Sequence, residues 1–299
     1  MIRRTQLTVA LLAIALHAGA DGRRRAVAPA PEVALEFTFD AGFRVVGATN
    51  PQPGVDPVTG QVHLYYVDHA TGQPRVAVSS DGLSFPAGTS AVNVFRNDAR
   101  NTRLPDGTWR RFQWNFGTSQ FSSLFSPDGI TFTPESGVRY TLQPADKGTL
   151  GVYDAFSDRQ GGVVLLYLGD LPGLNNVRRA YSRDNGLTFT FDRGNILGDD
   201  TAGGGANSFV DEKSIRLPDG RIRLFTMRQN TIYSFVSNDD GYSFVRDPGI
   251  RLERANFKEA TLTSLNDPVV VRLPDGRFRM YGASLRSDQV WVVVSATTR

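Results

Sequence analysis

The sequence predicts an all-β protein, a five-bladed β-propeller, and three observations support this prediction. A Ser-x-Asp-(x)-Gly-x-Ser/Thr-Phe motif recurs four times, at 79–85, 126–132, 182–189 and 237–244. Short runs rich in β-branched and aromatic residues, bounded by Gly, Pro, Asn and Asp, lie between the motifs. Beyond the first 20 residues no stretch keeps a helical period. Repeated units of this length with several strands each are typical of propeller blades.

The spacing of the repeats defines the blades. The phenylalanines that end the four motifs are separated by 47, 57 and 55 residues, and another 55 residues follow the last one. Three units also share an LPDG turn, at 104–107, 217–220 and 273–276, where Pro presets φ and Asp-Gly completes a hairpin. Strand-like runs follow the turns, at 62–67, 109–114, 163–169, 222–227 and 278–283. Third strands are expected at 75–80, 231–237 and 290–296.

The last unit ends without a fourth strand. The run LEFTF at 35–39 supplies it, so we expect the two ends of the domain to pair and close the ring. Long connections between blades, at about 133–152, 190–209 and 245–265, should then share one face of the disc. Within them, the glycine-rich stretch 198–209 is expected to move as a lid.

The N-terminal segment predicts export. Residues 1–20 carry Arg3 and Arg4, an apolar stretch at 7–16 and small residues at 18–20, the pattern of a signal peptide. The apolar stretch is too short to span a bilayer. Residues 21–34 predict a disordered linker, and residues 35–299 a single propeller domain. We therefore expect a secreted or periplasmic monomer with no membrane span after signal cleavage.

Composition excludes several classes of function. The absence of cysteine excludes disulfides and thiolate sites, and three histidines are too few for a His-rich metal site, so no cofactor is expected. A Ca²⁺ ion bridging carboxylates stays open as an alternative. The formal charge of +3 includes two arginines in residues 1–20 and three in the linker, so the folded body is nearly neutral. No nucleic-acid-binding motif is present.

The inner strand of each blade begins with a polar residue at the face of the long connections. The sequence therefore predicts a ring of these residues around one mouth of the propeller. A ring of acids suits the hydrolysis of glycosidic bonds, which needs two carboxyl groups. We expect the catalytic groups among Asp98, Asp154, Asp211 and Glu212. Substrate-binding residues are expected among Asn50, Arg100, Tyr153, Arg228, Asp267 and Arg286.

The Ser-x-Asp motifs resemble the Asp-box, or bacterial neuraminidase repeat, of sialidases and other secreted propellers, with Phe in place of the usual Trp. The resemblance implies that each motif forms a structural turn between the third and fourth strands of a blade. The aspartates of the motifs are therefore expected to stabilise these turns and not to be catalytic: Asp81, Asp128, Asp184 and Asp239. The layout also resembles five-bladed arabinanase- and β-xylosidase-like glycosidases, which place an Asp base in the first blade, where this chain has Asn50.

Two functions remain open from the sequence. The first is a glycoside hydrolase of exo-sialidase-like or five-bladed type, acting on a glycan through the inner-strand acids. The second is a non-catalytic propeller that binds a glycan or a protein, in which these acids bond the backbone of neighbouring blades.

Overall fold

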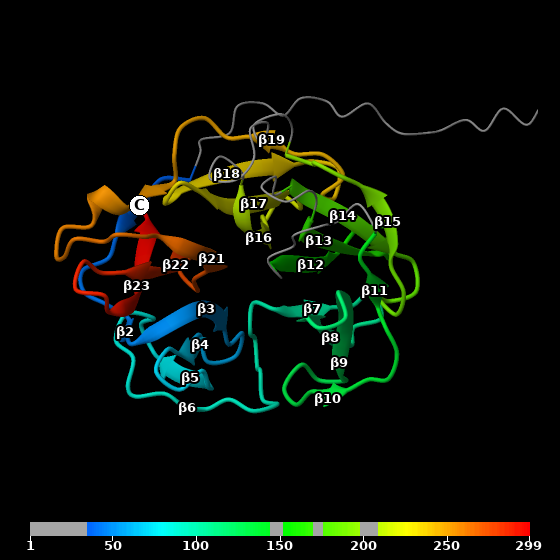
Figure 1. Cartoon of the computed structure of the whole chain (residues 1–299), viewed down its shortest axis with the longest axis horizontal. Coiled ribbons are helices and arrows are strands. Elements are labelled where there is room, and N and C mark those ends of the chain that lie inside the picture. Colours follow the sequence, from blue (N-terminus) through cyan, green and yellow to red (C-terminus); the bar gives the residue numbers. More distant parts are fainter. Residues whose placement is uncertain (1–34, 144–151, 170–175, 198–208) are drawn as a thin grey trace, which may run out of the picture.

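The computed structural model describes residues 35–143, 152–169, 176–197 and 209–299, and it confirms the five-bladed propeller (Figure 1). The expected signal peptide and linker, and residues 198–208 of the expected lid, lie outside the described residues. Among the described residues, no helix is long and apolar enough to cross a membrane.

Each blade is an antiparallel sheet whose first strand lies nearest the axis (Figure 1). Blade 1 contains β3 (Ala48–Val55), β4 (Val62–Asp68), β5 (Pro74–Ser79) and β6 (Thr89–Ser90). Blade 2 contains β7 (Asn101–Arg103), β8 (Trp109–Asn115), β9 (Gln120–Ser126), β10 (Thr133–Pro134) and β11 (Tyr140–Thr141). Blade 3 contains β12 (Tyr153–Ser157), β13 (Val163–Gly169), β14 (Asn176–Ser182) and β15 (Thr190–Arg193).

The remaining two blades complete the ring. Blade 4 contains β16 (Val210–Arg216), β17 (Ile222–Arg228), β18 (Thr231–Ser237), β19 (Val245–Arg246) and β20 (Leu252–Glu253), followed by the 3₁₀ turn η3 (Arg254–Asn256). Blade 5 contains β21 (Asn266–Arg272), β22 (Phe278–Leu285), β23 (Trp291–Thr298), β1 (Phe37–Phe39) and β2 (Val45–Val46). The outer strands are short, and those of blades 2, 3 and 4 lie inside ranges that the sequence assigned to connections, because few apolar residues mark them.

Strand β1 closes the ring, as the sequence predicted, by pairing antiparallel with β23. The closure divides one copy of the Ser-x-Asp turn between the two ends of the domain. Thr298 stands opposite the start of β22, where the other blades have the serine that opens the turn. Leu35 and Phe37 match the Leu-x-Phe that ends the turns at 83–85 and 187–189. The sequence Thr298-Arg299 followed by Leu35-Glu36-Phe37 therefore lacks only an Asp-Gly pair.

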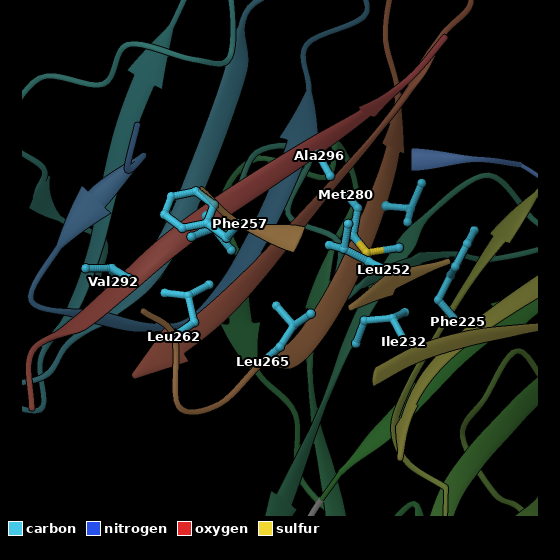
Figure 2. Close-up of a cluster of buried hydrophobic side chains, with 11 residues drawn as sticks. Phe225, Ile232, Leu252, Phe257, Leu262, Leu265, Met280, Val292 and Ala296 are labelled. Carbon is cyan, nitrogen blue, oxygen red and sulfur yellow. The ribbon is translucent and has the colours of Figure 1, made fainter. Parts of the chain in front are cut away.

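Apolar side chains fill the interfaces between neighbouring blades. The described residues form five buried clusters, and each of them joins a different pair of adjacent sheets. In the cluster between blades 4 and 5, Phe225 and Ile232 of blade 4 pack towards Met280 and Ala296 of blade 5 (Figure 2). Burial of this kind, at about 25 cal/mol per Å² of apolar area, is the main force that holds the blades together.

The four Ser-x-Asp turns are fastened by their own side chains. In the turn at 237–244, the Asp239 carboxylate accepts bonds from the Ser237 hydroxyl at 2.8 Å and the Ser243 N–H at 2.9 Å. The Gly241 N–H donates to Ser237 Oγ at 2.7 Å. Asp81, Asp128 and Asp184 make equivalent bonds in the other three turns. These bonds stabilise the ionised form, which lowers the pKa of Asp81 to about 2.

An acid-x-Gly-x-Arg segment links three pairs of blades, and the sequence analysis did not identify it. The copies are 40–44, 135–139 and 247–251. Their arginines donate to a carbonyl of the next blade's turn region, from Arg44 to Leu83 O, Arg139 to Leu187 O and Arg251 to Leu35 O.

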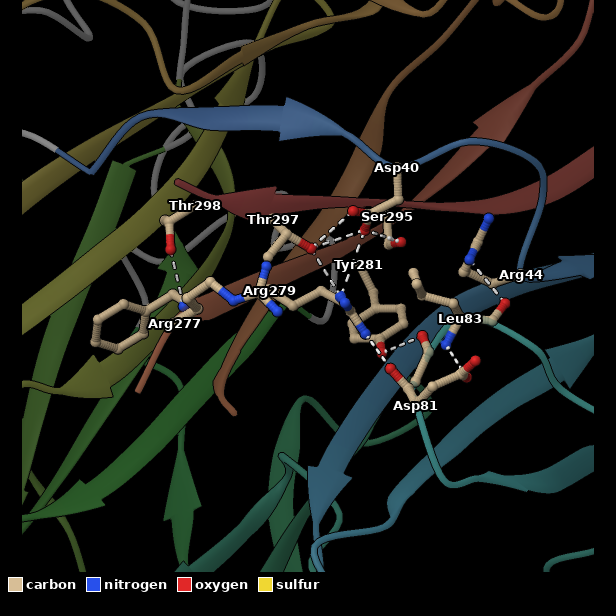
Figure 3. Close-up of polar contacts among 12 residues, drawn as sticks. Asp40, Arg44, Asp81, Leu83, Arg277, Arg279, Tyr281, Ser295, Thr297 and Thr298 are labelled. Atoms are coloured by element: carbon tan, nitrogen blue, oxygen red, sulfur yellow. Dashed lines mark hydrogen bonds and ion pairs between the residues drawn. The ribbon is translucent and has the colours of Figure 1, made fainter. Parts of the chain in front are cut away.

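Figure 3 shows this link between blades 5 and 1. The Asp40 carboxylate accepts from the Ser295 hydroxyl at 2.6 Å and pairs with Arg279 at 3.4 Å. Arg279 donates across the interface to Asp81 O at 2.5 Å, and the Tyr281 hydroxyl donates to Gly82 O at 2.7 Å. The turn face is therefore used for joining blades, whereas the opposite face carries the connections between them.

Candidate active site

The five inner strands begin at one mouth of the propeller axis, on the face of the blade-to-blade connections. We call this end the axial mouth. Each blade contributes at least one of the expected polar residues there: Asn50 in β3, Asp98 just before β7, Asp154 in β12, Asp211 and Glu212 in β16, and Asp267 in β21.

In blades 1, 4 and 5 a β-bulge lies at this polar residue. The pairing register shifts at this point of β3, β16 and β21. Asn50, Asp211 and Asp267 have φ angles of 52°, 60° and 51°. Positive φ is uncommon for non-glycine residues, and Asn and Asp tolerate it best. Bulges re-aim side chains and are frequent next to active sites.

Three of the aspartates bond the backbone of the following blade. Asp154 Oδ2 accepts from the Ser214 N–H at 2.8 Å and from the Ser214 hydroxyl. Asp211 Oδ2 accepts from the Asp267 N–H at 3.3 Å, and the Asp267 carboxylate accepts from the Asn50 N–H. The acids therefore connect blades 3, 4, 5 and 1 around the axial mouth.

Glu212 differs from these aspartates because its carboxyl group is buried without a partner. The residue is 0% exposed, and neither carboxyl oxygen has a hydrogen-bond partner in another residue. Burial, with smaller contributions from the charges of Asp211 and Asp154, raises the pKa of Glu212 to about 8. Glu212 is therefore largely protonated at neutral pH, which is the state that a general acid needs.

The neighbouring acids are also shifted upward. Burial and the nearby charge of Asp211 raise the pKa of Asp267 to about 7. Burial raises the pKa values of Asp211 and Asp154 as well, although hydrogen bonds and the charge of Lys213 oppose it. Crowded carboxyl groups of this kind share protons near neutral pH, so the cluster offers both protonated and ionised members.

Asp98 lies in a different electrostatic environment, against two arginines. Its carboxylate pairs with Arg100 at 2.7 Å and with Arg111 at 2.9 Å, and the Arg111 guanidinium lies 3.6 Å from the centre of the Phe95 ring. Burial acts to raise the pKa of Asp98, but the two guanidinium charges outweigh it and hold the pKa below its ordinary value. Asp98 is therefore ionised at neutral pH and paired with two guanidinium groups.

The expected binding residues have described contacts of their own. The Tyr153 hydroxyl donates to Phe112 O at 2.5 Å, and burial raises the pKa of Tyr153. Arg228 lies 4.5 Å from the centre of the Phe209 ring, in blade 4. Arg286 forms an ion pair with Asp288, and Arg100 is held by Asp98. Each of these three arginines therefore has a contact with another group of the protein.

Lys213 and Ser214 are the residues at this site that the sequence analysis missed. Together with Asp154 they line a cavity of about 250 Å³ along the inner strands. The available signal was compositional, because Lys213 is one of three lysines in a chain rich in arginine and directly follows two acids. Among the described residues no three His, Cys, Asp or Glu side chains are arranged to hold a metal ion.

The comparisons with known proteins identify the fold. No protein-family model matches the chain, and no curated protein matches by sequence. Among solved structures, the catalytic domain of a GH62 α-L-arabinofuranosidase from Coprinopsis cinerea aligns with a TM-score of 0.62 and 12% identity, over 88% of this chain and 97% of that one. An α-L-arabinofuranosidase from Podospora anserina, in complex with cellotriose, aligns with a TM-score of 0.63 and 12% identity, over 89% and 97%.

An endo-arabinase from Bacteroides thetaiotaomicron also aligns, with a TM-score of 0.56 and 16% identity over 89% of this chain and 98% of that one. The same architecture occurs in an N-acetylgalactosamine deacetylase from F. plautii, with a TM-score of 0.55 and 13% identity over 89% and 94%. The chain therefore has the five-bladed architecture of these glycoside hydrolase propellers. Because the deacetylase shares that architecture, the reaction must be argued from the site.

Proposed function

We propose that this protein is a secreted glycoside hydrolase in which Glu212 donates the proton to the leaving oxygen. The observation that carries the proposal is the buried, unpartnered Glu212 carboxyl group, whose pKa is raised to about 8 beside ionisable aspartates. Glycoside hydrolysis needs one carboxyl group that stays protonated and a second one that is ionised. The mouth offers both within one cluster.

Asp267 is the proposed base. As the glycosidic C–O bond breaks, Glu212 gives its proton to the leaving oxygen, and Asp267 takes a proton from the water that attacks the anomeric carbon. The Asn50 N–H bond stabilises the ionised form of Asp267. This assignment accounts for Asn50 in the first blade, because the missing acid is replaced by one in the adjacent blade. Asp154 and Asp211 hold the mouth together through the backbone of the next blade.

The arrangement favours a pentose-releasing enzyme of the arabinanase or arabinofuranosidase type over an exo-sialidase. A sialidase would use a free tyrosine as nucleophile and arginines on the substrate carboxylate. Here the Tyr153 hydroxyl is bonded to Phe112 O, and Arg100 is paired with Asp98. The structural neighbours named as arabinofuranosidases and an endo-arabinase support the same substrate class.

A second candidate is a propeller that binds a glycan without cleaving it. It is favoured by the bonds from Asp154, Asp211 and Asp267 to the backbone of neighbouring blades, which give these acids a structural role. The complete burial of Glu212 also fits this alternative, since a proton donor must reach its substrate.

Product analysis separates the two candidates. The purified full-length protein and Glu212→Gln would be incubated with arabinan, arabinoxylan and sialyl-lactose, and released sugars would be measured by chromatography. Release of arabinose or arabino-oligosaccharides that disappears in the variant supports the proposal. Retention on an arabinan affinity gel without release favours the binding protein. Release of sialic acid, or neither release nor retention, contradicts the proposal.

A further inference from the structure

We propose that Lys213 is a positioning residue whose ammonium group keeps the acids of the axial mouth from all being protonated, and so fixes which of them can act as a base. This inference deepens the proposed function, because it concerns the same acids. Its main test needs no substrate, so the two can fail separately.

The position of Lys213 is fixed by three groups from blade 3. Its ammonium group donates to the carbonyl oxygen of Tyr153, lies 4.0 Å from Asp154 Oδ1, and lies 5.3 Å from the centre of the Tyr153 ring. The Lys213 side chain is 12% exposed, and the Asp154 side chain is 6% exposed. A lysine held this way loses much of its hydration, and nearby negative charge is needed to offset the free-energy cost of burying its ammonium group.

The charges around Lys213 come from each neighbouring inner strand. Asp154 belongs to β12, Asp211 and Glu212 precede Lys213 directly in β16, and Asp267 lies in β21. Beyond Tyr153, the acid of blade 2 is already paired with two arginines and adds little net charge. The pKa values of all four acids are raised overall by burial, and the charge of Lys213 opposes that rise in each of them.

The residue type suits this role. The chain has 33 basic residues and only three of them are lysines. A guanidinium is planar and pairs with one carboxylate at a time in a fork, whereas an ammonium is a compact charge that interacts with several acids around it. One ammonium among four carboxyl groups leaves the cluster short of positive charge. The cluster therefore keeps some protons while at least one acid is ionised.

The sign of the expected pH dependence follows from the raised pKa values. An acid whose pKa is raised by folding stabilises the folded state at low pH, and this contribution is lost as pH rises through the folded pKa. Removing the ammonium raises these pKa values further, so the loss becomes larger and extends to higher pH. Near pH 5, below the raised pKa values of Glu212 and Asp267, these two acids are protonated, and removal of the ammonium should matter less than at pH 9.

The experiment measures unfolding by urea between pH 5 and pH 9 for the full chain, Lys213→Met and Lys213→Arg. We expect the unfolding constant of the Met variant, relative to the unsubstituted protein, to increase about tenfold or more from pH 5 to pH 9. The Arg variant keeps the charge but pairs with one carboxylate at a time, so its ratio should change much less with pH than that of the Met variant. Lys258→Met is the matched control, since Lys258 is an exposed lysine of the connection before β21.

The inference would be overturned if the unfolding constant of Lys213→Met, divided by that of the unsubstituted protein, stayed constant with pH. A side chain that acts only through packing would give a constant ratio. If Lys213→Met does not fold at any pH, the double variant Glu212→Gln/Lys213→Met distinguishes a charge role from a packing role, because it also removes one of the neighbouring acids. Recovery of folding supports the charge role, and failure to recover contradicts it. If hydrolysis is absent while the ratio changes with pH, the proposed function fails and the role of Lys213 stands.

Discussion

At the scale of single residues, Glu212 and Asp98 show how surroundings decide what a buried acid does. Both carboxyl groups are almost fully buried at the axial mouth. Asp98 faces two arginines and has a lowered pKa, whereas Glu212 faces other acids without a hydrogen-bond partner and has a raised one. The pairing of Asp98 with arginines stabilises the blade, whereas the surroundings of Glu212 keep a proton on its carboxyl group.

Replacing Asp98 by Asn should destabilise the protein by about 3–5 kcal/mol at pH 7, because the change leaves Arg111 buried without its counter-charge. The stabilisation is present above the ordinary aspartate pKa and is lost as pH falls through the lowered one. Urea unfolding of the variant at pH 7 and pH 3 checks both statements.

The exposed pair Asp275 and Arg277 is the control for Asp98. Its Asp275→Asn variant should lose much less stability, because both side chains stay hydrated. Equal losses in the two variants would contradict the view that burial makes the Asp98 pair important.

The sequence placed these acids correctly in the blades but could not assign their partners. The repeat register brings Asp98, Asp154, Asp211 and Asp267 to equivalent positions, and the structure has them at the starts of the inner strands. Asp154 and Asp211 bond residues of the next blade that lie far along the chain, as with Asp154 and Ser214, which are 60 positions apart. A single sequence carries no signal for such contacts, and the signal for Lys213 was only its rarity as a lysine in a chain rich in arginine.

At the scale of elements, the turns were predictable because each is specified by its own residues. The Ser-x-Asp and LPDG turns form from bonds within a few residues. The acid-x-Gly-x-Arg segments were missed although three copies are present in the sequence. Their function is to contact the next blade, which becomes visible only when the blades are assembled.

Replacing Asp239 by Ala should cost about 1–2 kcal/mol of stability and leave activity unchanged, since the turn loses three side-chain bonds on the face opposite the acids. Thermal unfolding together with product release measures both. Asp239→Asn keeps an acceptor oxygen and should lose less. A loss of activity that exceeds the loss of folded protein would show that the turn face contributes to the site.

At the scale of the whole molecule, the ring is held by apolar clusters between blades and closed by its two ends. The pairing of β1 with β23 was predictable, because the last repeat lacks a fourth strand and LEFTF is left over at the other end. The short outer strands and the bulges of the inner strands could not be predicted from the sequence, because they depend on contacts across the ring.

A circular permutant tests the closure. In residues 35–299, Arg299 would be joined to Leu35 through Asp-Gly, and new ends would be opened between Val58 and Thr59, where Val58 is 91% exposed. The linker restores a complete Ser-x-Asp turn, so the permutant should be about 1–2 kcal/mol more stable than the same chain joined by Ala-Ala. Equal stability with both linkers would contradict the divided-turn interpretation.

The central claim is that Glu212 protonates the leaving group of a glycoside, and leaving-group dependence tests it most directly. kcat/KM would be measured for the unsubstituted protein and Glu212→Gln on 4-nitrophenyl α-L-arabinofuranoside, whose leaving group needs no proton, and on an arabino-oligosaccharide, whose leaving group does. The account predicts a loss of about 10²–10⁴-fold on the oligosaccharide and a much smaller loss on the nitrophenyl substrate. Equal losses on both substrates, or no loss on either, would contradict it.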